Sequence, residues 1–145
     1  MNDAAVRQVV AMAAEGLPVF LTTVGAAGVP HLTTVGAITL LEHDRLRLTE
    51  WFCPQTVENT RDNRHVSLTV WDPAHNTGWQ LTGQVELIQA AAVMNGYDPN
   101  APAEPIPQML SMLDLRVEHA MRFHHGPHND RQEQGLAKEN RARRA

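Results

Sequence analysis

The chain of 145 residues is poor in several residue types and patterns, and each shortage excludes a class of protein. Cys53 is the single cysteine, so no intrachain disulfide can form and a reducing compartment is the simpler expectation. No apolar run approaches the roughly 18 residues of a membrane span, and the N-terminus lacks the basic and apolar blocks of a secretory signal. The formal charge of -4 argues against a general nucleic-acid binder. We therefore expect a cytoplasmic protein that binds neither membrane nor nucleic acid.

Short apolar alternations follow one another along the chain. A first helix is expected over residues 3–15, where Val6, Val9 and Val10 share a face and Gly16 ends the pattern. Strands are expected over residues 18–24, 30–41, 45–52, 66–71 and 79–87, with turn residues between them. Such a succession indicates an antiparallel barrel or sandwich.

The C-terminal third is harder to interpret. Residues 97–107 hold four prolines, which excludes a regular helix or a central strand there. Residues 115–123 alternate and suggest a last strand, although a helix with one apolar face fits nearly as well. The tail from Asn129 has no apolar period. We expect a single domain over residues 1–128 and a disordered basic tail over residues 129–145.

The stretch "EWFCPQTVENTRDN", residues 50–63, changes character in its middle. A strand with two aromatic residues ends before Pro54, which suits the first turn of the polar helix that follows. The first amides of such a helix lack internal partners and attract anions, and Gln55 and Thr56 offer two further donors to a phosphate. Alternatively, Thr56 only caps the helix, and Asn59 and Asn63 are solvated surface residues.

Three segments carry a family resemblance: "GVPHLTTVGAITL", "LRLTEWFCPQTVENTRDNRHVSLTVW" and "GWQLTGQVEL". In this order and spacing they resemble the small FMN-binding, split-barrel proteins of the pyridoxamine 5'-phosphate oxidase-like class. The similarity extends from about Leu17 to Leu87. It implies a mainly β fold, a six-stranded antiparallel split barrel with a few peripheral helices, which works as a homodimer with FMN at the subunit interface.

The resemblance also implies a set of cofactor-binding residues. The phosphate contacts fall on Gln55 and Thr56, and Asn59 supports the turn. Flavin contacts from the second strand fall on His31, Thr33, Thr34 and Val35. Those at the end of the third strand fall on Glu50, Trp51 and Phe52, whereas Trp79 and Gln80 match a segment that often reaches the flavin from the other subunit.

Departures from the family pattern limit what the resemblance implies. Gln55 stands where relatives place a lysine or arginine, so a bound phosphate has one fixed cation fewer. The terminal arginine-histidine motif of the vitamin B6 oxidase is missing, so oxidation of pyridoxamine phosphate is not expected. We expect an FMN-dependent oxidoreductase that passes electrons between a reduced nicotinamide and a small acceptor, with the chemistry on the flavin and no catalytic protein acid or base.

Three alternatives to this expectation remain open. The first is a non-catalytic flavin- or haem-binding module or electron carrier. The second is a member of the deazaflavin-using branch, which shares the barrel. The third is a scaffold that has lost its ligand.

Four histidines lie close together near the C-terminus: His119, His124, His125 and His128. Imidazoles are common ligands of transition metals. However, adjacent residues on a strand point to opposite faces, so His124 and His125 would not converge. We therefore expect no metal site, and a surface turn from His125 to His128. Trp71 and Trp79 are expected to be packing residues.

Overall fold

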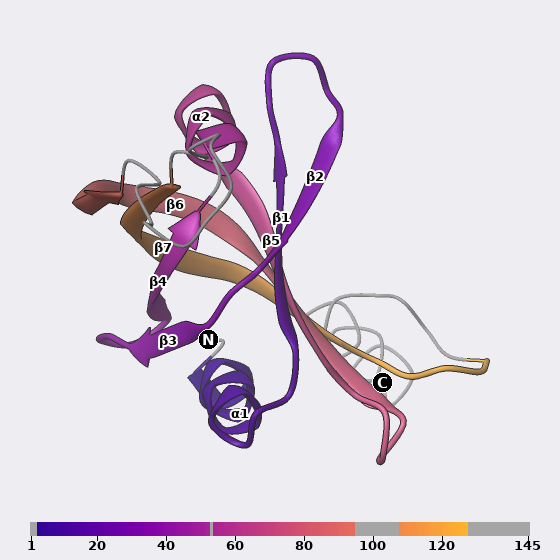
Figure 1. The fold of residues 1–145 in the computed structure, drawn as a ribbon. Helices are drawn as coiled ribbons and strands as arrows, with labels where there is room; N and C mark the ends of the chain where they lie inside the picture. Colours follow the sequence, from indigo (N-terminus) through magenta and orange to yellow (C-terminus); the bar gives the residue numbers. More distant parts are fainter. Residues whose placement is uncertain (1–2, 53, 95–107, 128–145) are drawn as a thin grey trace, which may run out of the picture.

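The computed structural model describes residues 3–52, 54–94 and 108–127, and Figure 1 shows their arrangement. The elements are α1 (Asp3–Ala14), β1 (Val19–Val24), β2 (Pro30–Thr34), β3 (Ala37–Leu40), β4 (Arg45–Phe52), α2 (Pro54–Asp62), β5 (His65–Asp72), β6 (Thr77–Met94) and β7 (Gln108–Phe123). No helix in the described ranges is long and apolar enough to cross a membrane.

The helix α1 forms where the sequence predicts it. Val6, Val9 and Met12 lie on its buried side, at the spacing that one face of a helix requires. The helix ends at Ala14, and Gly16 follows it with a φ of 88°, in the left-handed region that glycine adopts without strain. The amide of Leu17 then donates to the carbonyl oxygen of Met12 at 3.3 Å.

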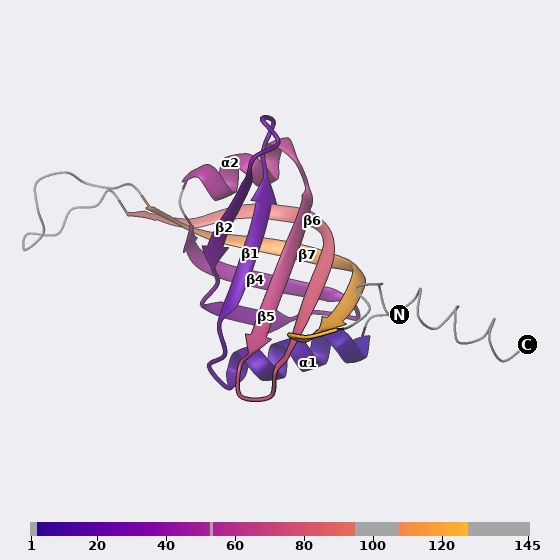
Figure 2. The same cartoon turned by 90° about the vertical axis from the view of Figure 1, so that its right-hand side faces the viewer.

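The seven strands form one antiparallel sheet in the order β2-β1-β5-β6-β7-β4-β3. Its two edge strands, β2 and β3, are separated in sequence only by Val35 and Gly36, so the sheet curls until its edges approach each other (Figure 2). The predicted fold class, an antiparallel split barrel, is confirmed.

The strand count differs from the expected six because the predicted strand over residues 30–41 is two strands. The chain turns a corner at Val35, which is buried and donates its amide to the carbonyl oxygen of Val19 at 2.9 Å. The apolar pattern continues through the corner, so the pattern alone does not show it. The two halves pair with different strands, β2 with β1 and β3 with β4.

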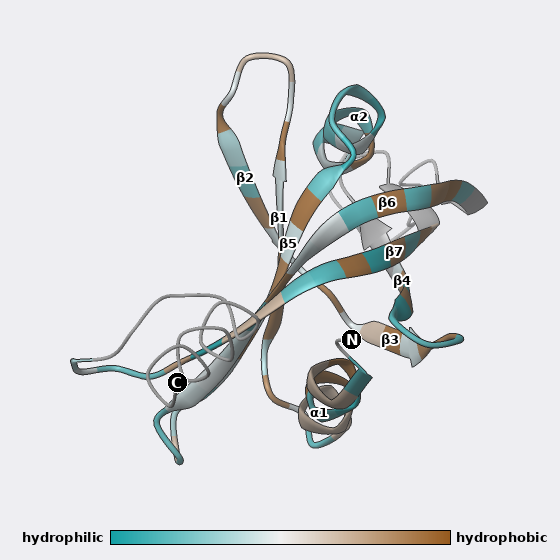
Figure 3. Cartoon of the chain, turned by 180° about the vertical axis from the view of Figure 1, so that it is seen from behind, coloured by the Kyte–Doolittle hydropathy of each residue, from teal (hydrophilic) through white to brown (hydrophobic). Residues whose placement is uncertain are grey.

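The apolar core fills the inside of the curled sheet. Its fully buried side chains come from five strands and α1 and are Val6, Val9, Leu21, Leu46, Leu48, Leu68, Val70, Leu81, Leu113, Leu115 and Val117. The two helices lie at opposite ends of the barrel, α1 near the β5–β6 hairpin and α2 at the other end (Figures 1 and 2). Figure 3 shows that α2 is the more hydrophilic of the two.

Two long strands, β6 and β7, complete the barrel. The strand alternative for residues 115–123 is confirmed, and β7 begins earlier, at Gln108. The predicted strand over residues 79–87 is also part of a longer one. The pairing of β6 with β7 has a register shift between Thr82 and Gly83. The proline-rich residues 97–107 and the basic tail over residues 129–145 lie outside the described residues.

Candidate functional site

The helix α2 begins at Pro54, as predicted, and its buried face carries polar side chains. Thr56, Asn59 and Thr60 are all buried, although their side chains are polar. Asn59 is 3% exposed, which excludes the alternative in which it is a solvated surface residue. A polar side chain at such a position requires hydrogen-bond partners.

Asn59 connects α2 to the first strand. Its side-chain amide donates to Oγ1 of Thr23 on β1 at 3.1 Å, and its Oδ1 accepts a hydrogen bond from Nε2 of Gln55 at 2.7 Å. A Cβ built on Gly25 would collide with Oδ1 of Asn59, so the turn after β1 approaches the helix as closely as glycine permits. Asn59 therefore holds the start of α2 against the β1–β2 turn.

Thr56 is buried without a hydrogen-bond partner. Its side chain is fully buried, and among residues 3–52, 54–94 and 108–127 no donor or acceptor reaches its Oγ1. Thr60, one turn further along the same helix, donates its hydroxyl to the carbonyl oxygen of Val57 at 2.8 Å. An unpartnered buried hydroxyl costs roughly 1–3 kcal/mol of stability, which a ligand oxygen beside it would recover.

A second buried polar atom without a partner belongs to His31 on β2, an element that packs against α2. In the described part of the chain four side-chain atoms have this property: Asp3 Oδ1, His31 Nε2, Thr56 Oγ1 and His119 Nδ1. Two of the four thus belong to the predicted cofactor-binding residues. Unpartnered polar groups of this kind fit a site that is completed by a ligand.

The predicted contacts on β2 do not share one surface. His31 and Thr33 alternate with the exposed Leu32 and Thr34 and are turned toward the inner face of the sheet. Val35 is buried, and its amide is bonded within the protein. A ligand along β2 can therefore contact the side chains of His31 and Thr33 together, but Thr34 only from the other face.

The remaining predicted residues fall into two groups. The backbone of Glu50, Trp51 and Phe52 pairs with β7, and their side chains lie outside the described part of the structure. Trp79 is buried, with the guanidinium of Arg122 5.0 Å from its ring centre, and it lines a cavity of about 430 Å³ beside α1. Gln80 points to the opposite face and donates to Oγ of Ser67 at 2.8 Å. Trp79 thus lies beside α1, whose Gln8, Met12 and Glu15 line the same cavity.

Charge around the start of α2 is sparse. The only basic residue within the helix is Arg61, in the last turn. Elsewhere Arg47 forms a two-point ion pair with Asp114, at 2.8 and 3.0 Å. A phosphate at the helix start would therefore depend on amides, a hydroxyl and the helix dipole rather than on a neighbouring cation of this helix.

The histidines of the predicted turn are separated from His119. His125 is anchored by Asn76, whose side chain accepts from its amide at 2.9 Å and donates to its carbonyl oxygen at 3.0 Å. His124 and His125 are exposed after the end of β7, whereas His119 lies within the strand, and His128 is outside the described residues. Within the described ranges, no three potential metal ligands gather.

Sequence reasoning missed Thr23 as a partner of the helix. It occupies an ordinary alternating strand, "VFLTTV", and its hydroxyl is bonded to a residue 36 positions away. No local signal distinguishes it from Thr22, because only the packing of α2 on β1 decides which of the two threonines faces the helix.

Comparison with known proteins gives a family and a fold. A family model described as "Pyridoxamine 5'-phosphate oxidase" matches residues 5–122. A comparison with curated proteins gave no match. Among solved structures, HupZ of Group A Streptococcus superposes with a TM-score of 0.59 at 18% identity, covering 84% of this chain and 97% of that one.

Two further solved structures are similar. A pyridoxamine 5'-phosphate oxidase-related, FMN-binding protein of Nostoc punctiforme gives a TM-score of 0.61 at 12% identity, covering 85% of this chain and 83% of that one. An F420 reductase gives a TM-score of 0.52 at 21% identity, and the match covers 72% of this chain and 88% of that one. At these identities the structures show a shared fold, while the match over residues 5–122 shows that the chain belongs to the pyridoxamine 5'-phosphate oxidase family.

Proposed function

We propose that the protein is a cytoplasmic, homodimeric FMN-binding flavoprotein that transfers electrons between a reduced nicotinamide and a small acceptor. The family supports a flavin, and one similar structure is described as FMN-binding. The observation that carries the proposal is the unpartnered hydroxyl of Thr56, buried in the first turn of α2. That is where a phosphate oxygen would meet both the hydroxyl and the first helix amides.

The start of α2 supplies the phosphate site in this proposal. Thr56 donates its hydroxyl to a phosphate oxygen, and the unpaired amides of the first turn donate beside it. Asn59 positions the turn through its bonds to Thr23 and Gln55. Gln55 uses one side-chain hydrogen for Asn59, which leaves the second for the phosphate. With an amide in place of a cation, we expect weaker binding of FMN than in relatives that have lysine or arginine here.

In this proposal the inner face of β2 and the end of β4 hold the isoalloxazine ring and the ribityl chain of FMN. His31 offers a buried ring nitrogen that has no partner in the described part of the chain, and Thr33 lies two residues away on the same face. The bound flavin supplies the electron transfer, while the barrel orients the ring and excludes water from it. No protein acid or base is required for this role.

The proposal of a second subunit is supported by the position of Trp79. Trp79 lines the cavity beside α1, and α1 and α2 lie at opposite ends of the barrel (Figures 1 and 2). In a homodimer, the Trp79–Gln80 segment of the second copy can reach the flavin whose phosphate is held at α2. Light scattering of the flavin-loaded protein should give twice the chain mass, and a monomer that retains flavin would contradict the shared site.

The visible spectrum of freshly purified protein tests the cofactor, and turnover tests the activity. We expect flavin bands, FMN as the flavin released on denaturation, and oxidation of NADH or NADPH in the presence of an acceptor. Bound flavin without turnover would favour the alternative of a non-catalytic carrier. A Soret band would favour haem, and preferential binding of a deazaflavin would place the protein with the F420 reductase that it resembles.

A further inference from the structure

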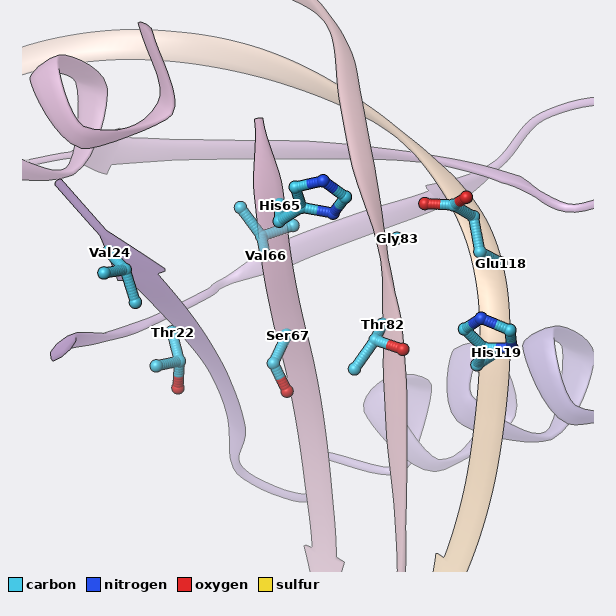
Figure 4. Close-up of a pocket in the computed structure, with 9 residues that line it drawn as sticks. All are labelled: Thr22, Val24, His65, Val66, Ser67, Thr82, Gly83, Glu118 and His119. Atoms are coloured by element: carbon cyan, nitrogen blue, oxygen red, sulfur yellow. The ribbon is translucent and has the colours of Figure 1, made fainter. Parts of the chain in front are cut away.

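The cavity of about 430 Å³ beside α1 lies between this helix and the hairpin of β5 and β6, whereas α2 is at the opposite end of the barrel (Figures 1 and 2). Side chains alternate along β6, so that Trp79 lines this cavity and Thr82 lines a groove on the other face of the sheet (Figure 4). Gln80 also points to that other face, where it bonds to Ser67. The strand β6 therefore separates the cavity from the face that carries Gln80.

Arg122 contributes a cation to the cavity. Its partner in the strand register is Trp79, and its guanidinium lies 5.0 Å from the centre of the indole ring. Contact with the ring restrains the guanidinium without neutralising its charge. None of the ion pairs among residues 3–52, 54–94 and 108–127 includes Arg122. The cavity thus has a positive charge that lacks a counter-ion in this part of the chain.

An anion lines the same cavity at the C-terminal end of α1. Glu15 follows Ala14, the last residue of the helix. The helix dipole places partial negative charge at this end, and the last turn has no basic residue to offset it. In the described ranges no ion pair includes Glu15. A carboxylate at this end of a helix is electrostatically unfavourable, so a cation bound beside it would be stabilised.

The second carboxylate that lines the cavity, that of Asp72, already has partners in the hairpin turn. Its Oδ1 accepts hydrogen bonds from the amides of Ala74 and His75 at 3.1 and 3.4 Å, and its Oδ2 lies 2.7 Å from Nδ1 of His75. These contacts close the turn, so Asp72 has a structural role. In the described part of the chain, the two charges of the cavity without a partner are therefore one anion and one cation, on Glu15 and Arg122.

An apolar surface accompanies these two charges. Met12 and Trp79 are both buried and both line the cavity. Gln8 and Thr77 add an amide and a hydroxyl, which are neutral hydrogen-bonding groups. The volume is in the lower part of the range of ligand pockets, which indicates a small molecule rather than a dinucleotide. The ligand that fits has an apolar group and a charge of each sign.

We propose that this cavity binds a small zwitterion, a free amino acid with an apolar side chain. Its carboxylate pairs with the guanidinium of Arg122, whose planar fork matches carboxylate geometry, and its ammonium group pairs with Glu15. A ligand of one sign would neutralise only one of the two charges. Because Glu15 and Arg122 are exposed, each ion pair strengthens binding by no more than about fivefold. Binding of the amino acid does not depend on the proposed flavin function.

L-Leucine is a suitable probe, because two simpler molecules carry the same branched alkyl group. Isocaproate lacks the ammonium group, and isoamylamine lacks the carboxylate. Titration of the full-length protein with each compound, followed by amide NMR spectra with and without FMN, measures the three affinities. We expect leucine to bind at millimolar concentration and a few-fold more tightly than either control, in both forms of the protein. The proposal would be overturned if leucine did not bind, or if either control bound as tightly.

Charge-removing variants locate the two ends of the bound leucine. Arg122→Gln should weaken leucine and isocaproate up to about fivefold without weakening isoamylamine, and Glu15→Gln should weaken leucine and isoamylamine without weakening isocaproate. Arg61→Gln, a change in the last turn of α2, is the matched control and should affect none of the three. Equal losses for all three compounds in either cavity variant would refute the assignment of the two ends. Loss of leucine binding on loading with FMN would assign the cavity to the flavin instead.

Discussion

Replacing Thr56 by valine tests the phosphate site through two effects of opposite sign. Valine keeps the shape and β-branching of threonine and replaces only the hydroxyl, which has no partner among the residues that the structure describes. Without ligand, the variant should be more stable by about 1 kcal/mol, because an unsatisfied buried polar group has been removed. In a chain of this size that corresponds to a rise in Tm of about 2–4 °C.

The same variant should bind FMN more weakly. A hydroxyl that donates to a charged phosphate contributes about 1.5–3 kcal/mol, so the dissociation constant should rise about 10- to 150-fold. Riboflavin lacks the phosphate, and its affinity should hardly change. Titration of flavin-free protein with both ligands, followed by fluorescence quenching, measures the two affinities.

Thr60→Val is the matched control, since Thr60 is fully buried in the same helix but donates to the carbonyl oxygen of Val57. Loss of this hydrogen bond should lower the free energy of unfolding by about 1 kcal/mol and leave the ratio of FMN to riboflavin affinity unchanged. The reasoning would be refuted if Thr56→Val destabilised the free protein as Thr60→Val does, or if it weakened FMN and riboflavin equally.

Three further predictions concern the packing of the helix and strands in the barrel. Asn59→Ala should lower the free energy of unfolding by about 1–3 kcal/mol in urea titrations, because Thr23 loses its buried partner; an unchanged urea midpoint would contradict this role. The hydrogen bond from His75 lowers the pKa of Asp72, so its stabilising effect is present above the ordinary carboxyl pKa and is lost as the pH falls through the lowered value. Asp72→Asn should therefore make the decline of the urea midpoint below about pH 4 shallower, and an unaltered profile would count against it. Gly83→Ala should destabilise the protein and shift the amide NMR signals of β7 near Arg116, since the added methyl group meets the backbone of that residue at the register shift of β6 and β7. An unaltered β7 spectrum would show that the register shift tolerates a side chain.

The local elements of the fold could be predicted from sequence because each has a local cause. The alternation of Leu46 and Leu48 with charged neighbours gives β4, and the change at Pro54 gives the start of α2. The corner at Val35 had no such signal, since its cause is a hydrogen bond to Val19 on another strand. The row of hydroxyl side chains Thr22, Ser67 and Thr82 was equally hard to predict, because it exists only through the register of three strands.

The sequence predicted where the candidate site lies, but it did not predict which residues contact one another there. The resemblance placed Thr56 and Asn59 together on one helix, and the structure shows that both are buried. The partner of Asn59 on β1 depends on how α2 packs, which residue type does not reveal. Likewise, the position of Trp79 beside α1 depends on how the barrel closes, which residue type does not reveal.

The stability of the fold explains why some buried side chains of α2 are polar, but it does not explain all of them. Asn59 and Thr60 are buried with their side-chain hydrogen bonds made inside the protein, so they hold the helix in place whether or not a ligand binds. Thr56 is buried at least as completely, yet its hydroxyl has no hydrogen-bond partner among the described residues, and a valine there would remove that unsatisfied group. In the proposed function, the partner of this hydroxyl comes from outside the chain. Its place in the first turn of the helix, where amides also lack partners, makes an anion the appropriate partner.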